Sequence, residues 1–289
     1  MDKRKIPIII GPTAIGKTKY AIDLSLELGA EIISADSMQV YKYMNIGTAK
    51  PSHEEQKRVP HHLIDTIYPD AEWNMSLFQK ETNKLLKKNS KYVIVGGTGL
   101  YIKSLIYNYG TTDIKADKQV RDKYNMLAEN EGISKLHELL SEIDPKAASN
   151  ITVNDKFRLV RALELYDITG KIPSSLKTQD ESYAANFKLI CLSADRPHIY
   201  NNINLRVDQM VKNGLFEEVE SLMNMGYSKD LSSMQALGYK ESIDYIENRM
   251  SKLDCIDKIK QKTRNFAKRQ LTWYRSFKDV KWIDIETLK

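Results

Sequence analysis

The sequence predicts an α/β fold, in which a P-loop-type parallel sheet is flanked by helices and interrupted by a mostly helical insertion domain. Three observations indicate this fold. Short apolar runs alternate with segments of helical periodicity, the first run leads directly into a glycine-rich motif, and the alternation stops in the middle of the chain. Strands that alternate with helices favour a parallel sheet covered on both faces, because parallel neighbours need crossover connections.

Six short apolar runs are the expected strands, at residues 6–10, 31–34, 63–67, 92–95, 187–192 and 280–283. Helical spacing of apolar residues predicts helices at 20–28, 77–86, 199–212, 216–223, 240–248 and 256–274. From about residue 114 to 182 the pattern is helical and shows no strand. We therefore expect residues 1–113 and 183–289 to form one core and residues 114–182 to form a helical insertion domain.

Composition excludes several classes of protein. The 289 residues are 42% hydrophobic and 28% charged, which is typical of a soluble globular chain. No apolar run approaches the ~20 residues that span a bilayer, and the first strand follows the N-terminus too closely for a signal peptide. Cys191 and Cys255 are isolated, so neither a disulfide framework nor a cysteine-rich zinc site is expected. A cytoplasmic protein without zinc is the default.

The positive charge of the chain is concentrated near its C-terminus. Residues 258–281 hold nine Lys and Arg residues against one Asp, a net charge of +8, whereas the whole chain carries +6. The rest of the chain therefore sums to −2. A basic patch interleaved with aromatic residues favours an RNA partner, whose phosphates attract the cations and whose unpaired bases stack on ring planes. The alternative is an ordinary solvated face of a helix.

The strongest motif is a phosphate loop of the form Gly-x-x-x-x-Gly-Lys-[Ser/Thr], between the first strand and the first helix. Its residues are Gly11, Pro12, Thr13, Ala14, Ile15, Gly16, Lys17 and Thr18. The glycines let backbone N–H groups surround phosphate oxygens at a helix N-terminus. Lys17 supplies a charge for the terminal phosphate, and the Thr18 hydroxyl is placed to ligate Mg²⁺. Alone, such a motif usually marks an ATP-binding kinase or an ATPase.

Polar residues follow two other predicted strands. Asp36 comes after the second strand, and Thr98 lies in the glycine-rich turn after the run at 92–95. The carboxyl ends of parallel strands converge on one crevice, so both residues are expected to face the phosphate loop. Asp36 would accept a proton and Thr98 would approach a phosphate oxygen. The alternatives are a turn-capping Asp36 and a tight strand-to-helix turn at Thr98.

Other residues near these positions have less specific interpretations. Ser37 and Gln39 could hydrogen-bond the polar edge of a base. A metal-binding Asp would be expected after the run at 92–95, where the chain has glycines, and Asp65 could play that part instead.

Eight strings, in order across nearly the whole chain, together resemble the bacterial tRNA dimethylallyltransferases. They are GPTAIGKT from Gly11, ISADSMQVY from Ile33, IGTAKP from Ile46, VPHHLID from Val59, VGGTGLYI from Val95, RLVRALE from Arg158, LGYKE from Leu237 and TRNFAKRQLTWYR from Thr263. The family transfers a dimethylallyl group from dimethylallyl diphosphate to N6 of adenosine 37, beside the tRNA anticodon. The combination is far more specific than any single string.

The resemblance implies a role for each ambiguous residue. The phosphate loop, with Mg²⁺ on Thr18, would hold the isoprenoid diphosphate rather than ATP. Asp36 would be the general base that takes the proton of N6, and Thr98 would help to stabilise the leaving diphosphate. Two positions depart from the family: Ile15 replaces a small residue, and Asn202 stands where a diphosphate-contacting Arg is frequent. Arg206, one helical turn on, is then the expected diphosphate contact.

The expected partners are the tRNA anticodon stem-loop, over which the family's insertion closes, and dimethylallyl diphosphate; we expect a monomer. The residues expected to contact tRNA are Asp36, Ser37, Met38, Gln39, Thr98, Arg121, Phe157, Arg158, Leu159, Val160, Arg161, Lys240, Arg264, Lys268, Arg269, Gln270 and Arg275.

Three alternatives stay open. A small-molecule kinase leaves the basic segment unused, and a non-catalytic RNA-binding module does not explain Asp36 and Thr98. A prenyltransferase acting on free adenine nucleotides is closer, although the basic helix argues against it.

Overall fold

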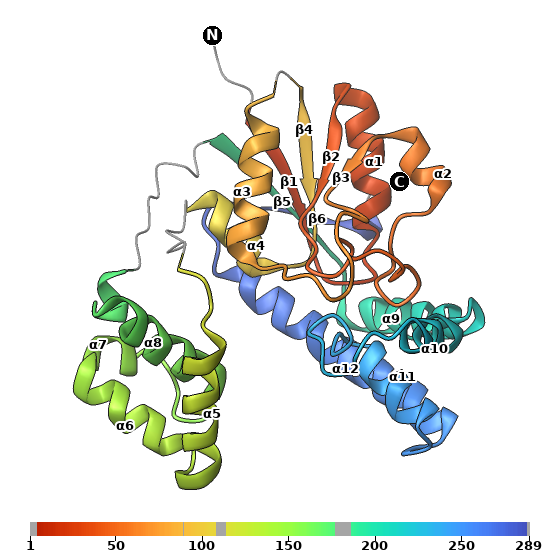
Figure 1. The fold of residues 1–289 in the computed structure, drawn as a ribbon. Helices are drawn as coiled ribbons and strands as arrows, with labels where there is room; N and C mark the ends of the chain where they lie inside the picture. The colour runs from red at the N-terminus through yellow and green to blue at the C-terminus, as the bar shows by residue number, and fades with distance from the viewer. Residues whose placement is uncertain (1–4, 89, 108–113, 177–185, 288–289) are drawn as a thin grey trace. The chain divides into compact units, whose positions relative to one another are not determined.

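The computed structural model describes residues 5–88, 90–107, 114–176 and 186–287. The chain divides into two compact units (Figure 1). The core unit consists of Met1–Ile106 and Ala184–Lys289, and the insertion unit is Tyr107–Tyr183. Of the predicted insertion limits, residue 114 lies just inside the described chain, whereas residue 182 lies outside it.

The core unit contains a six-stranded sheet in the order β3-β2-β4-β1-β5-β6, with every neighbouring pair parallel. The strands are β1 (Ile6–Ile10), β2 (Glu31–Ser34), β3 (His61–His62), β4 (Tyr92–Val95), β5 (Phe187–Ser193) and β6 (Lys281–Asp284). In the centre, Ile8 pairs with Ile94 on one side and Leu189 on the other. Ile8, Ile9 and Ile10 are completely buried, as expected for a strand covered on both faces. The predicted α/β fold is confirmed.

The third predicted strand, at 63–67, is wrong. The strand there is only His61–His62, which pairs with Ile32 and Ile33. Leu63 and Asp65 have φ angles of 61° and 49°, and this left-handed conformation does not continue a strand. Only Ile67 of the predicted run makes a bridge, to Tyr41. The strand therefore ends before the apolar run begins.

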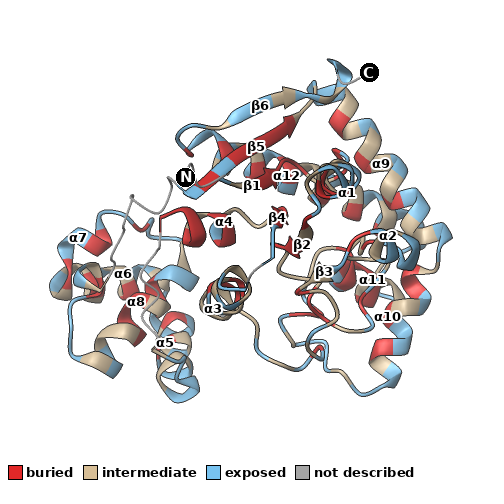
Figure 2. Cartoon of the chain, turned by 90° about the horizontal axis from the view of Figure 1, so that it is seen from above, coloured by how far each residue is buried: buried red, intermediate tan, exposed pale blue. Residues whose placement is uncertain are grey.

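Helices cover both faces of the sheet, with α3 and α4 on one side and α1 on the other (Figures 1 and 2). The core-unit helices are α1 (Lys17–Leu28), α2 (His53–Arg58), α3 (Met75–Leu86), α4 (Gly99–Ile106), α9 (Arg196–Lys212), α10 (Leu215–Asn224), α11 (Tyr239–Ile246) and α12 (Lys252–Arg275), with a short 3-10 turn, Ile285–Thr287, after β6. An apolar cluster joins α9–α12 to the segment after β2 through Val40, Tyr41, Met44 and Tyr239. This cluster places α9–α12 beside the ends of the strands.

The insertion unit is built from α5 (Lys118–Glu131), α6 (Ile133–Ile143), α7 (Pro145–Ala148), α8 (Lys156–Thr169) and the 3-10 turn Pro173–Ser175. The side chains of Asp117, Asp144 and Asp155 cap α5, α7 and α8 by accepting backbone N–H bonds. Leu136, Leu140, Leu159 and Leu163 are fully buried in the unit's own apolar core. The described part of this unit contains no strand.

Candidate active site

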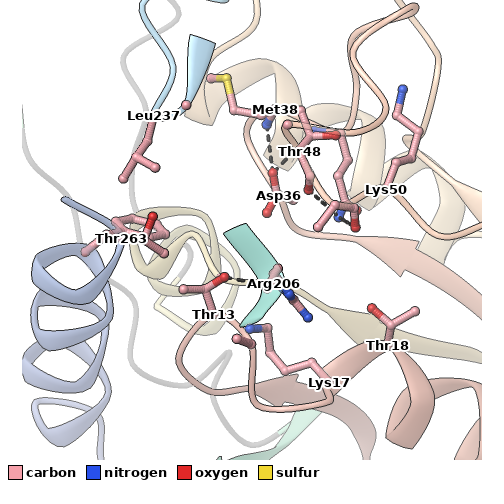
Figure 3. A pocket seen from close by; sticks show the side chains of 18 of the residues that line it. Thr13, Lys17, Thr18, Asp36, Met38, Thr48, Lys50, Arg206, Leu237 and Thr263 are labelled. Carbon is pink, nitrogen blue, oxygen red and sulfur yellow. Dashed lines mark hydrogen bonds between the residues drawn. The ribbon is translucent and has the colours of Figure 1, made fainter. Parts of the chain in front are cut away.

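A cavity of about 550 Å³ lies in the core unit, at the carboxyl ends of β1, β2 and β4 (Figure 3). Its lining includes the phosphate loop after β1, Asp36 and its neighbours after β2, and Thr98 after β4. Ligands of open parallel sheets bind at this end, because consecutive strand ends open there onto one crevice. The sheet therefore brings together the three groups that the sequence placed after separate strands.

The phosphate loop has the backbone shape that its motif predicts. Gly16 has a φ angle of 90° and directly precedes α1, and the ideal position of a Cβ on Gly11 lies 2.7 Å from the Leu192 carbonyl oxygen. Lys17 Nζ donates hydrogen bonds to the carbonyl oxygens of Gly11 and Pro12, at 2.8 Å each. The ammonium group is thus held over the loop.

A second cation, Arg206 of α9, lies beside the loop. Its Nη1 donates to Thr13 Oγ1 at 3.5 Å, and Asn202, one turn earlier, donates through Nδ2 to the Ala14 carbonyl oxygen at 3.4 Å. Burial, followed by repulsion from Arg206, lowers the pKa of Lys17 to about 7. The Lys17 side chain is half-buried, but protein atoms surround its ammonium group. Two crowded cations make this end of the cavity a site for an anion.

Asp36 combines a turn with a candidate base. Its Oδ1 accepts the N–H groups of Met38 at 2.8 Å and Gln39 at 3.3 Å, which fixes the turn after β2. Burial raises the pKa of Asp36, while these N–H bonds and the charge of Lys17 oppose the rise. Among the described residues no hydrogen bond reaches the second oxygen, Oδ2. The capping and proton-accepting roles are therefore compatible, one on each oxygen.

The other residues near Asp36 mostly contact one another. Thr98 Oγ1 accepts the Ser37 N–H at 3.1 Å and donates to Ser37 Oγ at 3.4 Å, so it ties the turn after β4 to the turn after β2. The Gln39 amide donates to the carbonyl oxygens of Thr48 and Ala49 and accepts from Ser34 Oγ. Gln39 therefore holds a loop and does not present a free amide to a base.

Gln270 and Tyr274 of α12 join the phosphate loop to the glycine-rich turn. Gln270 Oε1 accepts the Thr13 N–H at 2.8 Å, and its Nε2 donates to the Gly97 carbonyl oxygen at 2.9 Å. The Tyr274 hydroxyl lies 3.0 Å from the same Gly97 oxygen. Gln270 is 4% exposed, so its predicted contact with RNA is corrected to a bracing role between two loops. Sequence reasoning missed Tyr274, whose only signal was its helical spacing from Gln270.

Glycine is needed after β4 because other chain segments approach closely. A Cβ placed on Gly96 would lie 2.2 Å from the Ala35 carbonyl oxygen, and one on Gly97 would lie 2.5 Å from Gln270 Nε2. Both contacts are far shorter than van der Waals distance. The glycine run thus brings the ends of β2 and β4 and the helix α12 against one another.

No cluster of three or more His, Cys, Asp or Glu side chains that could hold a metal ion occurs in the described ranges. Thr18, in the first turn of α1, lines the cavity and offers a hydroxyl oxygen. Asp65, the alternative metal ligand, instead pairs with Lys50 Nζ at 2.5 Å. A Mg²⁺ ion that keeps its waters and takes most other ligands from a diphosphate needs few protein groups, so this donor set fits it.

The remaining residues that were predicted to contact RNA are divided between the core unit and the insertion unit. Lys240, Lys268, Arg269 and Arg275 are exposed on the core unit, and Arg264 donates to Asn204 Oδ1 at 2.7 Å.

No described helix is long and apolar enough to cross a membrane.

The insertion unit carries the other predicted contacts. Phe157 is 79% exposed, and Arg158 beside it is also exposed. Arg121 and Arg161 both form ion pairs with the fully buried Glu164. For Leu159 and Val160 the prediction of RNA contact was wrong, because their side chains lie in the core of the insertion unit.

The apolar wall of the cavity was not predicted as part of the site. It is formed by side chains of α9, α10, α12 and the segment before α11, namely Val207, Met210, Leu215, Ala236, Leu237, Ile259 and Phe266. These residues are far apart in the sequence and look like ordinary core positions of amphipathic helices, so no local pattern could identify them.

Comparisons with known proteins, by sequence and by fold, agree on one family. The family model described as IPP transferase matches residues 39–277. A tRNA dimethylallyltransferase of Thermoanaerobacter sp. (strain X514) is 45% identical over 294 residues, covering 99% of this chain and 93% of the relative.

Two solved structures are similar over most of this chain. The full-length tRNA isopentenylpyrophosphate transferase of Bacillus halodurans has a TM-score of 0.71 and 40% identity, covering 98% of this chain and 90% of that one. A eukaryotic dimethylallyltransferase acting on tRNA has a TM-score of 0.77 and 25% identity, covering 98% and 74%. From the matched family model and these similarities, the chain belongs to the IPP transferase family.

Proposed function

We propose that this protein transfers a dimethylallyl group from dimethylallyl diphosphate to N6 of adenosine 37 in tRNA. The observation that carries the proposal is the division of one cavity into a cationic end, at Lys17 and Arg206, and an apolar wall formed by α9, α10 and α12. A prenyl diphosphate has the same division, between its charged head and its hydrocarbon tail. The relatives named above as tRNA-modifying enzymes support the choice of acceptor.

The cationic end would bind the diphosphate and stabilise its departure. Backbone N–H groups of the loop 11–18, Lys17 and Arg206 surround the place where negative charge grows as the carbon–oxygen bond breaks. Preorganised donors of this kind stabilise a transition state because they need no reorganisation during the reaction. Thr18 is the residue that would hold Mg²⁺ together with the diphosphate oxygens. When bound, the ion neutralises charge on the leaving group.

Asp36 would act on the other substrate. As N6 of the adenine forms its bond to the allylic carbon, the electrons of the carbon–oxygen bond leave with the diphosphate, and the N6 proton passes to Asp36. A carboxyl group whose pKa is raised by burial is a stronger base than an ordinary aspartate. Thr98 keeps the Asp36 turn against the turn after β4 through Ser37.

The exposed basic residues would bind the RNA. Lys268, Arg269 and Arg275 lie on the exposed side of α12, and Lys240 is exposed on α11. In the insertion unit, Phe157 would stack on an unpaired base and Arg158 would contact phosphate. We also propose that the protein acts on tRNA as a monomer in the cytoplasm.

The test is mass analysis of nucleosides from tRNA incubated with purified protein and dimethylallyl diphosphate. We expect an adenosine heavier by one dimethylallyl group at position 37, without added ATP. A strict requirement for ATP would favour the kinase alternative. Equal prenylation of free AMP and tRNA would favour a nucleotide prenyltransferase.

A further inference from the structure

Glu218 of α10 holds a loop that forms part of the cavity wall. Its Oε2 accepts the N–H groups of Asn45 and Ile46, at 2.8 Å each. Its Oε1 accepts the Gly47 N–H at 3.1 Å and the Tyr239 hydroxyl at 2.6 Å. Three successive backbone N–H groups that converge on one carboxylate form an anion-binding nest, which is satisfied here by the protein itself.

Tyr239 fixes the same loop from a second direction. It is the first residue of α11 and is fully buried. Burial raises the pKa of Tyr239 well above its ordinary value, so the hydroxyl stays protonated and donates a hydrogen bond to Glu218. The ideal Cβ position on Gly47 lies 2.4 Å from the Tyr239 ring, so the ring packs directly against the Gly47 backbone.

A short path of hydrogen bonds leads from this loop to Asp36. The next carbonyl groups of the loop, those of Thr48 and Ala49, accept from Gln39 Nε2 at 3.4 and 3.2 Å. The Gln39 backbone N–H in turn donates to Asp36 Oδ1 at 3.3 Å. Figure 3 shows Thr48 beside the Asp36 turn. The loop held by Glu218 is thus the support of the turn that carries Asp36.

Lys50, which directly follows the loop, holds it through contacts that do not involve Glu218. Lys50 Nζ donates to the Tyr41 carbonyl oxygen and to Asn45 Oδ1, at 2.8 Å each, and pairs with Asp65. A change at Glu218 therefore removes the backbone contacts of residues 45–47, while Lys50 still holds the Asn45 side chain and the chain that follows the loop. Lys17 and Arg206, at the cationic end of the cavity, belong to α1 and α9 and make none of these contacts.

We propose that Glu218, together with Tyr239, is a positioning residue that orients Asp36 through the loop 45–49 and Gln39. This inference rests on the proposed function, because it takes Asp36 as the base. Neither Glu218 nor Tyr239 needs to touch a reacting atom. Misplacement of a reacting group by about 1 Å costs on the order of 100-fold in rate, so a loosened support should lower kcat.

The experiment compares Glu218→Gln and Tyr239→Phe with the parent and with Glu220→Gln. Glu220 is exposed on the same helix, and its substitution makes the same change in charge. In Glu218→Gln an amide NH₂ would face the Gly47 N–H or those of Asn45 and Ile46, so the nest loses an acceptor. We expect kcat for tRNA prenylation to fall about 10- to 100-fold in Glu218→Gln and less in Tyr239→Phe, which keeps the carboxylate. The KM for dimethylallyl diphosphate should stay within about twofold, because Lys17 and Arg206 are unchanged.

The inference would be overturned if both variants keep the parent kcat, whether or not their KM for dimethylallyl diphosphate rises. If Glu218→Gln does not fold, as thermal unfolding will report, Tyr239→Phe alone decides. Absence of tRNA prenylation in the parent and in Glu220→Gln would instead contradict the proposed function, so the two failures are distinguishable.

Discussion

Lys17 and Asp36 show how the cavity changes the chemistry of ordinary side chains. Burial and Arg206 lower the pKa of Lys17 to about 7, and burial raises the pKa of Asp36. Both shifts favour the neutral form, because protein atoms replace the water that would stabilise a charge. An anionic ligand beside Lys17 reverses its shift by restoring an opposite charge. The diphosphate end is therefore expected to take up a proton on binding.

This gives the first prediction, proton uptake at Lys17. With a pKa of about 7 in the free protein, Lys17 is mostly neutral at pH 8 and mostly protonated at pH 6. Binding of diphosphate should then take up about one proton at pH 8 and few at pH 6, so affinity falls as pH rises. Calorimetry in buffers of different ionisation enthalpy measures the uptake. Lys17→Ala is the control for protons taken up by the diphosphate itself, and equal uptake in both proteins would contradict the prediction.

The second prediction concerns Asp36→Asn. The amide keeps the shape of the side chain and can still accept the Met38 N–H, but it cannot take a proton. Loss of a general base typically costs about 10²–10⁴-fold, so kcat should fall by that factor while the affinity for dimethylallyl diphosphate barely changes. Single-turnover assays with saturating substrates measure the rate. A folded variant that keeps most of the parent rate would leave Asp36 only its turn.

At the scale of elements, periodicity predicted more of the fold than of the site. Five of the six strands and the long helices followed from apolar runs and helical spacing, because burial alone sets these patterns. The helix predicted at 256–274 was correct, but its spacing did not identify Phe266 as part of the site: Phe266 is 37% exposed and lines the cavity, with Arg269 Cζ 5.8 Å from its ring centroid. The buried positions of this helix are Cys255, Ile259, Thr263, Ala267, Gln270 and Tyr274.

The site shows the same division between local and distant information. The phosphate loop and Asp36 stood out because each follows a strand and carries its chemistry in a few consecutive residues. The supports of the site did not, since Gln270 is 257 residues from its partner Thr13 and Glu218 is 173 residues from Asn45. Only the packed fold brings such pairs together, so single-sequence reasoning had no signal for them.

The third prediction tests the brace on α12. Gln270→Ala would leave the Thr13 N–H without its partner in a buried place, while the Gly97 carbonyl oxygen would keep only its bond from the Tyr274 hydroxyl. An unsatisfied buried group costs about 1–3 kcal/mol, so the free energy of unfolding should fall by that amount. Affinity for dimethylallyl diphosphate should fall as well, because Thr13 belongs to the phosphate loop. Gln261→Ala, exposed on the same helix, is the control in urea unfolding, and equal stability of the two variants would contradict a bracing role.

For the whole molecule, the proposed chemistry is confined to the core unit, whereas the proposed RNA contacts occur in both units. Every residue that lines the cavity belongs to the core unit. Exposed candidates for RNA contact occur in both units and are of two kinds: cations, on α12 and at Arg158 of α8, and an aromatic ring, Phe157 of α8. A cation contributes to RNA affinity through the release of counterions, so its contribution falls as the salt concentration rises. A stacked ring also contributes to affinity, but its contribution depends little on salt concentration.

The last prediction uses this difference. Lys268→Ala with Arg275→Ala should weaken tRNA binding and flatten the slope of log affinity against log salt by about one to two units, because each phosphate contact contributes about 0.7–0.9. Phe157→Ala should weaken binding by about 1–3 kcal/mol while the slope stays as in the parent, since stacking releases no counterions. Lys87→Ala with Lys88→Ala is the control for charge, because both lysines are exposed between α3 and the start of β4, away from the cavity at the other end of the sheet. Filter binding of tRNA across a range of salt concentrations measures all four proteins. An unchanged slope in the α12 variant would mean that these cations only solvate the helix, and a flattened slope in Phe157→Ala would contradict stacking.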